Sequence, residues 1–286
     1  MKKINNKKWL LISSLFLIIS TFSCTTLPNY MLPNEPMWKN NGLAENHQIN
    51  GRLKVVSFNI EFSRAIKKAI AELKNQPDLA NADVILLQEM HEKGTQEIAD
   101  ELGYNYVYYA FNYDIGYQQN FGNAILSKFP LENEEKIILP HAKRSNNRKR
   151  MVTLATITVN GKNILLCSVH LDTILLWRGK RLDQSKFLTN LITDYKARNK
   201  IDYAIIGGDF NTLLKNYRKK VISHYTAIDF DWMTEKVGAT GSEVNGWLKP
   251  TNDHIFADGF NLIDAGKYEQ TEASDHYPIW VEMSFE

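Results

Sequence analysis

Short apolar runs rich in β-branched and aromatic residues recur from Leu53 onward, and each run predicts a β-strand. They cover residues 53–60, 84–88, 104–110, 123–127, 151–159, 163–170, 203–207, 254–257 and 279–283. Segments with helical spacing, at 64–75, 94–102 and 179–197, lie between several of them. Asn160 and Gly161 join two of the runs as a two-residue hairpin turn, so the sheets cannot be wholly parallel. We therefore expect an α/β sandwich of mixed sheets, forming one domain over residues 51–286.

The composition is that of an ordinary globular protein. Apolar residues make up 44% of the chain and charged residues 23%, which is enough apolar material for a sizeable core. The first 24 residues hold four lysines and no acidic residue, so the remainder has 30 basic and 32 acidic residues. This near-neutral balance gives no global electrostatic argument for nucleic-acid binding, although a local basic patch would still attract phosphate.

Residues 1–24 have the pattern of an export signal. A cationic stretch precedes a largely apolar run over 9–22, which is too short to span a bilayer comfortably as a helix. The small residue before Cys24 resembles a bacterial lipobox, which implies cleavage and lipidation at Cys24. A plain secretory signal and an uncleaved anchor are the alternatives. We expect attachment to the bacterial cell envelope, at the outer membrane if the cell has two, with secretion as the second choice.

The stretch from 25 to 50 contains three prolines and several asparagines, and it predicts a tether. The two cysteines of the chain are Cys24 and Cys167, so no internal disulfide framework is expected.

Polar side chains stand at the ends of four predicted strands. These residues are Asn59, Glu89, His170 and the pair Asp209 and Asn211, which follows two glycines. Asp275 and His276 stand just before the C-terminal run. Buried polar groups are costly unless they converge on a partner, and a shared cation would satisfy them. Oxygen-rich ligands point to Mg²⁺, or to Mn²⁺, rather than to structural zinc.

Each of these residues also has a simpler interpretation. Asn59 alone fits a turn, Glu89 an edge charge, and His170 a core histidine. Asp209 and Asn211 together fit an Asx turn, and Asp275 fits a cap. The site hypothesis rests on their occurring together in one chain.

Seven short motifs in order resemble those of the endonuclease/exonuclease/phosphatase superfamily, which includes deoxyribonucleases, abasic-site endonucleases, sphingomyelinases and inositol polyphosphate 5-phosphatases. They are Ser57-Phe58-Asn59-Ile60, Gln88-Glu89, the run from Gly122 to Ser127, Val169-His170-Leu171-Asp172, Gly208-Asp209-Phe210-Asn211-Thr212, Asp253-His254-Ile255-Phe256 and Ser274-Asp275-His276. The resemblance implies a four-layered α/β/β/α sandwich with two mixed β-sheets and a site at the strand ends.

The resemblance also implies roles for single residues. Glu89 would be the principal metal ligand, assisted by Asn59, with Asp209, Asn211 and Asp275 as further ligands. His276 would act with Asp275 as the acid/base pair, and Asp253 would support the catalytic histidine. A water aligned by Asp209 or by His276 would attack phosphorus in line, while His170 and Asn211 hold the non-bridging oxygens.

A basic stretch over 143–150 precedes the run at 151. Such a stretch fits a solvated surface, but the resemblance implies that Arg148 or Arg150 contacts the substrate phosphate. Arg181 and Gln184, one helical turn apart, also match a family pattern, and a surface helix explains them equally well.

We therefore expect a Mg²⁺- or Mn²⁺-dependent phosphodiester hydrolase acting on nucleic acid. A membrane-facing phospholipid phosphodiesterase of sphingomyelinase type and a phosphomonoesterase are the alternatives. The apolar stretch at 174–177 is the candidate lipid-contacting loop. A non-catalytic surface binding protein built on the same fold is disfavoured because the candidate catalytic residues are all present. No protein partner is implied.

Overall fold

The computed structural model describes residues 29–42, 47–143, 147–173, 178–241 and 249–285. Cys24, the apolar stretch at 174–177 and Arg144 of the basic stretch therefore lie outside the described residues. Among the described residues, no helix combines the length and the hydropathy needed to cross a membrane.

Two mixed β-sheets form the centre of the molecule. In spatial order, sheet A contains β1 (Met37–Asn40), β4 (Asn105–Asp114), β5 (Gln119–Ser127), β3 (Val84–Met90), β2 (Arg52–Asn59), β13 (Ile279–Phe285) and β12 (Phe260–Lys267). Sheet B contains β10 (Asp231–Trp232), β11 (Asp253–Asp258), β9 (Tyr203–Asp209), β8 (Lys162–His170), β7 (Met151–Val159) and β6 (Glu132–Ile138). Two pairs, β2 with β3 and β8 with β9, are parallel.

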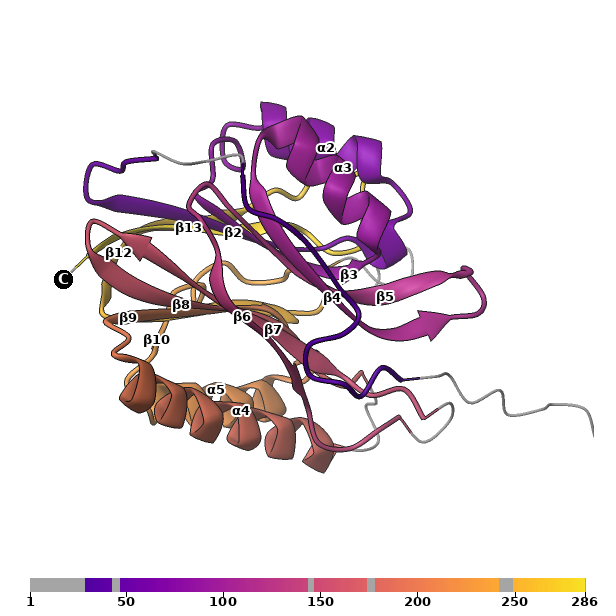
Figure 1. Cartoon of the computed structure of the whole chain (residues 1–286). Helices are drawn as coiled ribbons and strands as arrows, with labels where there is room; N and C mark the ends of the chain where they lie inside the picture. Colours follow the sequence, from indigo (N-terminus) through magenta and orange to yellow (C-terminus); the bar gives the residue numbers. More distant parts are fainter. Residues whose placement is uncertain (1–28, 43–46, 144–146, 174–177, 242–248, 286) are drawn as a thin grey trace, which may run out of the picture.

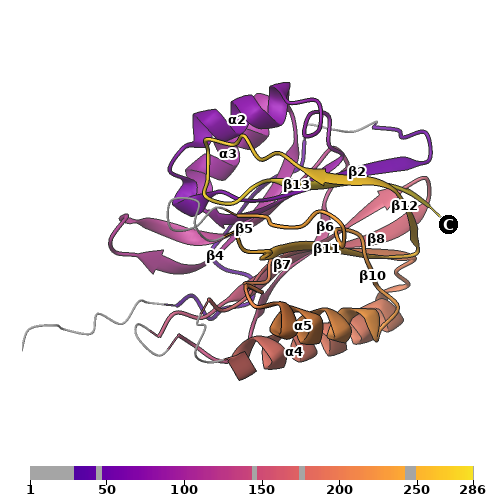
Figure 2. The same cartoon turned by 180° about the vertical axis from the view of Figure 1, so that it is seen from behind.

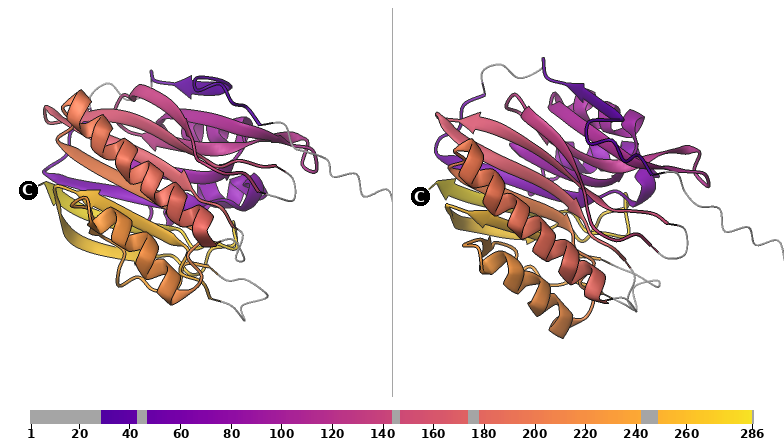
Figure 3. Two further views of the ribbon diagram at one scale, coloured as in Figure 1. Left: turned by 90° about the horizontal axis from the view of Figure 1, so that it is seen from below. Right: turned by 60° about the horizontal axis from the view of Figure 1, so that its bottom comes forward.

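Helices cover the outer face of each sheet. The helices α2 (Ile66–Asn75) and α3 (Glu92–Leu102) pack on sheet A, and α4 (Arg178–Asn199) and α5 (Lys215–Thr226) pack on sheet B. Figures 1 and 2 show the two helix layers on opposite sides of the paired sheets, and Figure 3 shows α4 and α5 lying side by side. This confirms the predicted four-layered α/β/β/α sandwich.

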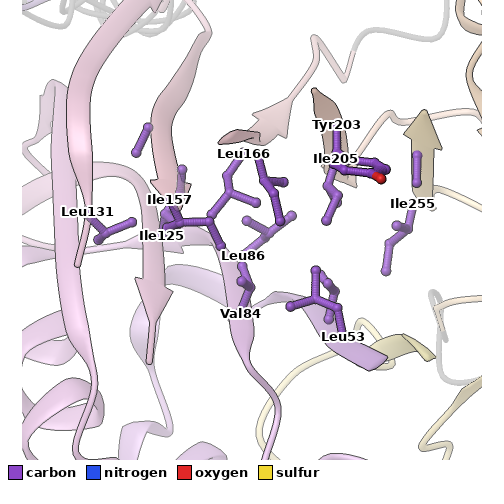
Figure 4. Close-up of a cluster of buried hydrophobic side chains, with 14 of the residues drawn as sticks. Leu53, Val84, Leu86, Ile125, Leu131, Ile157, Leu166, Tyr203, Ile205 and Ile255 are labelled. Carbon is purple, nitrogen blue, oxygen red and sulfur yellow. The ribbon is translucent and has the colours of Figure 1, made fainter. Parts of the chain in front are cut away.

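The alternation of side chains along the strands divides the core into three layers. In β2, Leu53 and Val55 point between the sheets, whereas Val56 and Phe58 point toward α2 and α3. Figure 4 shows Leu53 and Leu86 of sheet A meeting Leu166, Ile205 and Ile255 of sheet B. Strands buried on both faces read as nearly continuous apolar runs, which is why the sequence marks them clearly.

The hairpin between β7 and β8 forms as the sequence predicts. Asn160 and Gly161 have φ angles of 51° and 75°, the left-handed conformation that the tight turns favoured in hairpins require at both central positions. The sequence assigned residues 25–50 to a tether, yet β1 within that range pairs with β4 as an edge strand of sheet A.

Candidate active site

The carboxyl ends of the two parallel strand pairs lie at the same edge of the sandwich. In sheet A, Asn59 at the end of β2 pairs in register with Gln88, one residue before Glu89. In sheet B, His170 at the end of β8 pairs in register with Asp209 at the end of β9. The two sheets meet there, because Asn59 donates a hydrogen bond from Nδ2 to Oδ2 of Asp209 over 3.2 Å. The predicted strand-end residues are thus brought together.

Gly208 allows β9 to approach β8 closely enough for this arrangement. It has a φ of 147°, and a Cβ added there would lie 1.9 Å from the carbonyl oxygen of Val169. A side chain at this position would push the end of β9 away from β8. The glycine therefore fixes where Asp209 stands relative to His170.

Glu89 is held by a turn of unusual backbone conformation. This turn is the short segment η1 (Glu61–Ser63), which follows β2, and all three of its residues have positive φ angles. The backbone N–H of Phe62 donates a hydrogen bond to Oε2 of Glu89 over 3.2 Å. Glu89 itself has a φ of 58°. Strained backbone of this kind concentrates at functional sites, where surrounding contacts hold it.

The pKa of Glu89 is raised above its ordinary value. Burial is the main cause, and it outweighs the opposing charges of Arg150 and His276. The ionised carboxylate is therefore short of positive charge among the described residues.

His170 is a neutral hydrogen-bond donor aimed into the site. Burial, aided by the positive charges of Arg150 and His276, lowers its pKa well below the ordinary value. Arg150 lies 3.1 Å from Nδ1 of His170 through Nη1, and a guanidinium can only donate, so Nδ1 accepts and the proton sits on Nε2. That Nε2 is buried and has no hydrogen-bond partner among the described residues. It lies 3.4 Å from Asp209 Oδ2 and 3.8 Å from Glu89 Oε1.

Asp253 orients His276. Nδ1 of His276 lies 2.9 Å from Oδ2 and 3.1 Å from Oδ1 of Asp253. Thr240 donates its hydroxyl to Oδ2 of Asp253 over 2.7 Å, which fixes the carboxylate in turn. Burial alone would lower the pKa of His276, but the charges of Asp253, Asp209 and Asp275 together raise it well above its ordinary value.

The ring of His276 contacts Asp253, which the family resemblance implied as its support, rather than Asp275, which the resemblance implied as its acid/base partner. Asp275 lies at a bend and is exposed, whereas the side chain of His276 is buried. Asp275 stays near the site, because its charge contributes to the raised pKa of Glu89.

Asp209 stands at the centre of the cluster. Its Oδ1 accepts a hydrogen bond from the backbone N–H of Asn211 over 2.8 Å, which is the Asx-turn contact considered from the sequence. Its Oδ2 lies 3.9 Å from Nε2 of His276. Burial raises the pKa of Asp209, although His276 opposes the shift. The side chain of Asn211 donates to the carbonyl of Leu171 over 3.1 Å.

The donor set suits a hard divalent cation. Ligand atoms of Asp209, Asp253 and His276 lie within 4.8 Å of one another, so these three residues form a possible metal site. The oxygens of Asp253, however, already face His276 and Thr240. Asp209 is buried and Glu89 is partly buried, and the pKa values of both carboxyl groups are raised, so a bound cation would supply the positive charge that they lack.

The two predicted substrate arginines have different surroundings. Arg150 is buried beside His170, and burial together with Arg148 lowers its pKa to about 10, so it stays charged at neutral pH. Arg148 forms an ion pair with Asp114 at 2.5 Å and lies over the ring of Phe121.

Arg181 and Gln184 do not lie on an exposed helix surface. Both are buried on α4. Arg181 donates to the backbone carbonyl of Asp172, and the side chain of Gln184 accepts from the backbone N–H of Asp172. They hold the segment that follows β8, and with it the position of His170.

Two residues of this neighbourhood escaped the sequence interpretation. Thr240 and Phe62 come from irregular segments, so no periodic pattern marks them. Their contacts with Asp253 and Glu89 arise only when distant parts of the chain meet.

Residues 56–276 match the sequence profile of the endonuclease/exonuclease/phosphatase family. Among curated proteins, no sequence matches the chain significantly.

Three solved structures illustrate the similarity of fold. The endonuclease/exonuclease/phosphatase protein of Beutenbergia cavernae aligns with a TM-score of 0.69 and 16% identity, covering 82% of this chain and 72% of that one. The mannosyl-6-phosphatase of Bacteroides thetaiotaomicron aligns with a TM-score of 0.64 and 18% identity, covering 82% and 100%. Truncated TDP2 of Caenorhabditis elegans aligns with a TM-score of 0.62 and 20% identity, covering 82% and 97%.

Proposed function

The chain belongs to the endonuclease/exonuclease/phosphatase family, and from that premise we propose that it is a Mg²⁺-dependent phosphodiester hydrolase acting on nucleic acid, with Mn²⁺ as an alternative metal. One observation carries the proposal. Glu89, Asp209, His170 and the Asp253–His276 pair converge from both sheets at one end of the sandwich. Such a set of acid, base and neutral donor is what water attack on a phosphoester requires.

Glu89 and Asp209 would hold the metal, with Asn59, Asn211 and Asp275 as the further ligands that the family resemblance implies. A bound Mg²⁺ polarises a phosphoryl oxygen and makes a bound water easier to deprotonate.

The remaining steps belong to side chains of this protein. His170 donates its Nε2–H to a non-bridging phosphate oxygen, and Arg150 keeps that proton on Nε2. Asp209 receives the proton of the attacking water, and His276, whose Nε2 lies 3.9 Å from Asp209 Oδ2, could take that part only in its neutral form. Asp253 holds the His276 ring in the orientation that this transfer needs. Positioning and charge stabilisation supply most of the catalysis in phosphoryl transfer, so no covalent nucleophile is required.

The test uses the full chain, purified in detergent, with Mg²⁺, Mn²⁺ or EDTA. Plasmid DNA, RNA, sphingomyelin, mannose 6-phosphate and a chromogenic phosphodiester are the substrates. We expect metal-dependent cleavage of nucleic acid and of the chromogenic diester. Preference for sphingomyelin or for the monoester would favour the lipid or the phosphomonoesterase alternative instead.

Glu89→Gln provides the site-specific variant and Glu101→Gln, at an exposed position of α3, the matched control. We expect Glu89→Gln to reduce kcat/KM by about 10²- to 10³-fold, comparable to the loss of one electrostatic contact in other active sites. It should also abolish the rise of Tm that Mg²⁺ causes in the wild type, since a ligand that binds the folded state stabilises it. Activity that persists in EDTA, or an inert wild type with both metals, would contradict the proposal.

We also propose that Cys24 is lipidated and anchors the domain to the cell envelope. The support is the sequence pattern alone. Incorporation of an alkyne-tagged fatty acid, lost in Cys24→Ser, is the result that this proposal requires.

A further inference from the structure

A group of aromatic and guanidinium side chains, which we name the rim platform, lies beside the candidate active site. It consists of Phe62, Arg64 and Tyr117, contributed by the segment after β2 and by the turn between β4 and β5. The rings of Phe62 and Tyr117 stack with centroids 4.7 Å apart and planes inclined by 25°. The guanidinium of Arg64 lies 5.4 Å from the Tyr117 centroid and 5.7 Å from that of Phe62, and it donates to the Tyr117 hydroxyl.

The platform is attached directly to the catalytic cluster. The N–H of Phe62 holds Glu89, and the side-chain amide of Gln119 donates to the carbonyl of Phe62 over 3.1 Å. Phe62 also contacts Phe121, whose ring centroid lies 6.4 Å from that of His170. The platform therefore contacts Glu89 directly and is separated from His170 by one side chain, that of Phe121.

Packing alone does not account for the platform. Tyr117 is 41% exposed, and the side chain of Arg64 is 50% exposed. A ring needed only for the core would turn inward, as Phe121 does with no exposed surface. Here an exposed ring is instead kept in place by a stacked neighbour and by a cation.

We propose that the rim platform binds the nucleobase next to the scissile phosphate. An exposed aromatic ring flanked by a guanidinium group suits the face of any base, since every base has a π-face and stacking tolerates sequence. An acyl chain would strip water from Arg64 without replacing it, which argues against lipid at this position. Bases within a duplex are already stacked, so the platform selects single-stranded or terminal nucleotides.

This inference rests on the proposed function and names its substrate class. The contribution of base binding is measured with two substrates that share one leaving group. They are the p-nitrophenyl ester of thymidine 5′-monophosphate, which has a base, and methyl p-nitrophenyl phosphate, which has none. We expect the wild type to prefer the thymidine ester by about 5- to 150-fold in kcat/KM, the range that stacking of one base supports.

Tyr117→Ala should remove most of that preference, mainly through a higher KM for the thymidine ester, while Tyr117→Phe should keep it. Phe187→Ala removes an aromatic ring that is 40% exposed on α4 and should leave both rates unchanged. Equal effects of Tyr117→Ala on the two substrates would overturn the platform.

A binding measurement keeps the two proposals distinguishable. Isothermal titration of thymidine 5′-monophosphate, compared with methyl phosphate, reports base binding without turnover. The wild type could be inert on every substrate and still bind thymidine 5′-monophosphate more tightly than methyl phosphate. If Tyr117→Ala then loses that difference in affinity, the hydrolase proposal fails and the base-binding proposal is supported. If the two ligands bind equally to the wild type, the platform fails whatever the activity.

Discussion

Of three buried histidines, His170 and His254 are neutral and His276 is charged, because their neighbours differ. Burial and then Arg150 keep His170 neutral, whereas Asp253 and the nearby carboxylates favour the charged form of His276. His254, one residue after Asp253, is completely buried, and burial lowers its pKa to about 3. Trp232 donates to its Nδ1 over 3.2 Å, so its own proton sits on Nε2 beside the hydroxyl of Thr212.

His254 should make the fold less stable in acid. Its pKa is near 6.5 in the unfolded chain and about 3 in the folded one, so between these values the unfolded chain binds the extra proton. The free energy of unfolding is therefore retained above pH 6.5 and falls as the pH drops toward 3. Between pH 7.5 and pH 5 the expected loss is about 2 kcal/mol. Urea unfolding of the wild type and of His254→Gln at both pH values measures it.

The variant will be less stable at every pH, because glutamine fills the site imperfectly, but its pH dependence should be smaller by that amount. If the free energy of unfolding changes with pH by the same amount in the two proteins, His254 is not the group responsible.

At the scale of the elements, the end of β9 depends on its two glycines in different ways. A Cβ at Gly207 would meet Cδ1 of Leu86 at 2.7 Å, the flexible end of a side chain. A Cβ at Gly208 would meet the backbone of Val169, and the positive φ adds strain. We expect Gly207→Ala to cost about 1–3 kcal/mol by overpacking. Gly208→Ala should cost more than about 4 kcal/mol, the range of exceptional substitutions.

Thermal unfolding of the two variants gives the comparison, and activity per folded molecule shows whether Asp209 has moved. Similar losses of Tm for both glycines would contradict the close approach of β9 to β8.

The sequence predicted the strands that are buried on both faces and missed elements with few apolar residues. The strands β2, β3, β7, β8 and β9 were all located, with ends that differ by at most two residues. By contrast, β6 is a charged edge strand with the sequence ENEEKII, and α5 is largely polar. Edge strands carry charges that keep them from pairing further, and this removes the apolar pattern on which prediction relies.

The same contrast holds for the site. Glu89, His170 and Asp209 each end an apolar strand, so the sequence marked them and the sheet register brought them together. The strand pattern does not give the partner of His276, and only the family resemblance pointed to Asp253. Asp253 lies 23 residues away and contacts the ring only because the chain crosses between the two sheets, whereas Asp275 is merely adjacent in sequence.

At the scale of the whole molecule, the N-terminal segment is docked near the active-site edge. Asn29 donates to the carbonyl of Asn147 and accepts from the N–H of Lys149, both in the basic stretch that leads to Arg150. Lys136 is almost fully buried, and its ammonium group donates to the carbonyls of Tyr30 and Glu35. Figure 1 shows this segment running beside β4 toward the turn between β4 and β5.

A lipid on Cys24 would therefore hold the active site close to the membrane. Cys24 precedes Asn29 by five residues, and an extended chain spans at most ~3.6 Å per residue, so the anchor lies within about 18 Å of Asn29. A bilayer this close obstructs long substrates more than short ones. The quantity to measure is the rate of plasmid DNA cleavage divided by the rate of dinucleotide cleavage. We expect this ratio to be lower for the lipidated chain in vesicles than for Cys24→Ser in solution.

A flexible insertion tests whether the closeness of the active site to the membrane limits the cleavage of long substrates. Twenty glycine and serine residues placed after Pro28 add a root-mean-square span of about 25 Å. Because the insertion lies before the first described residue, it should leave the dinucleotide rate unchanged while raising the plasmid rate several-fold toward that of Cys24→Ser. If the insertion alters the two rates in the same proportion, the active-site edge does not face the membrane. The docking of Asn29 would then serve only to complete sheet A, with no influence on which substrates reach Glu89 and His276.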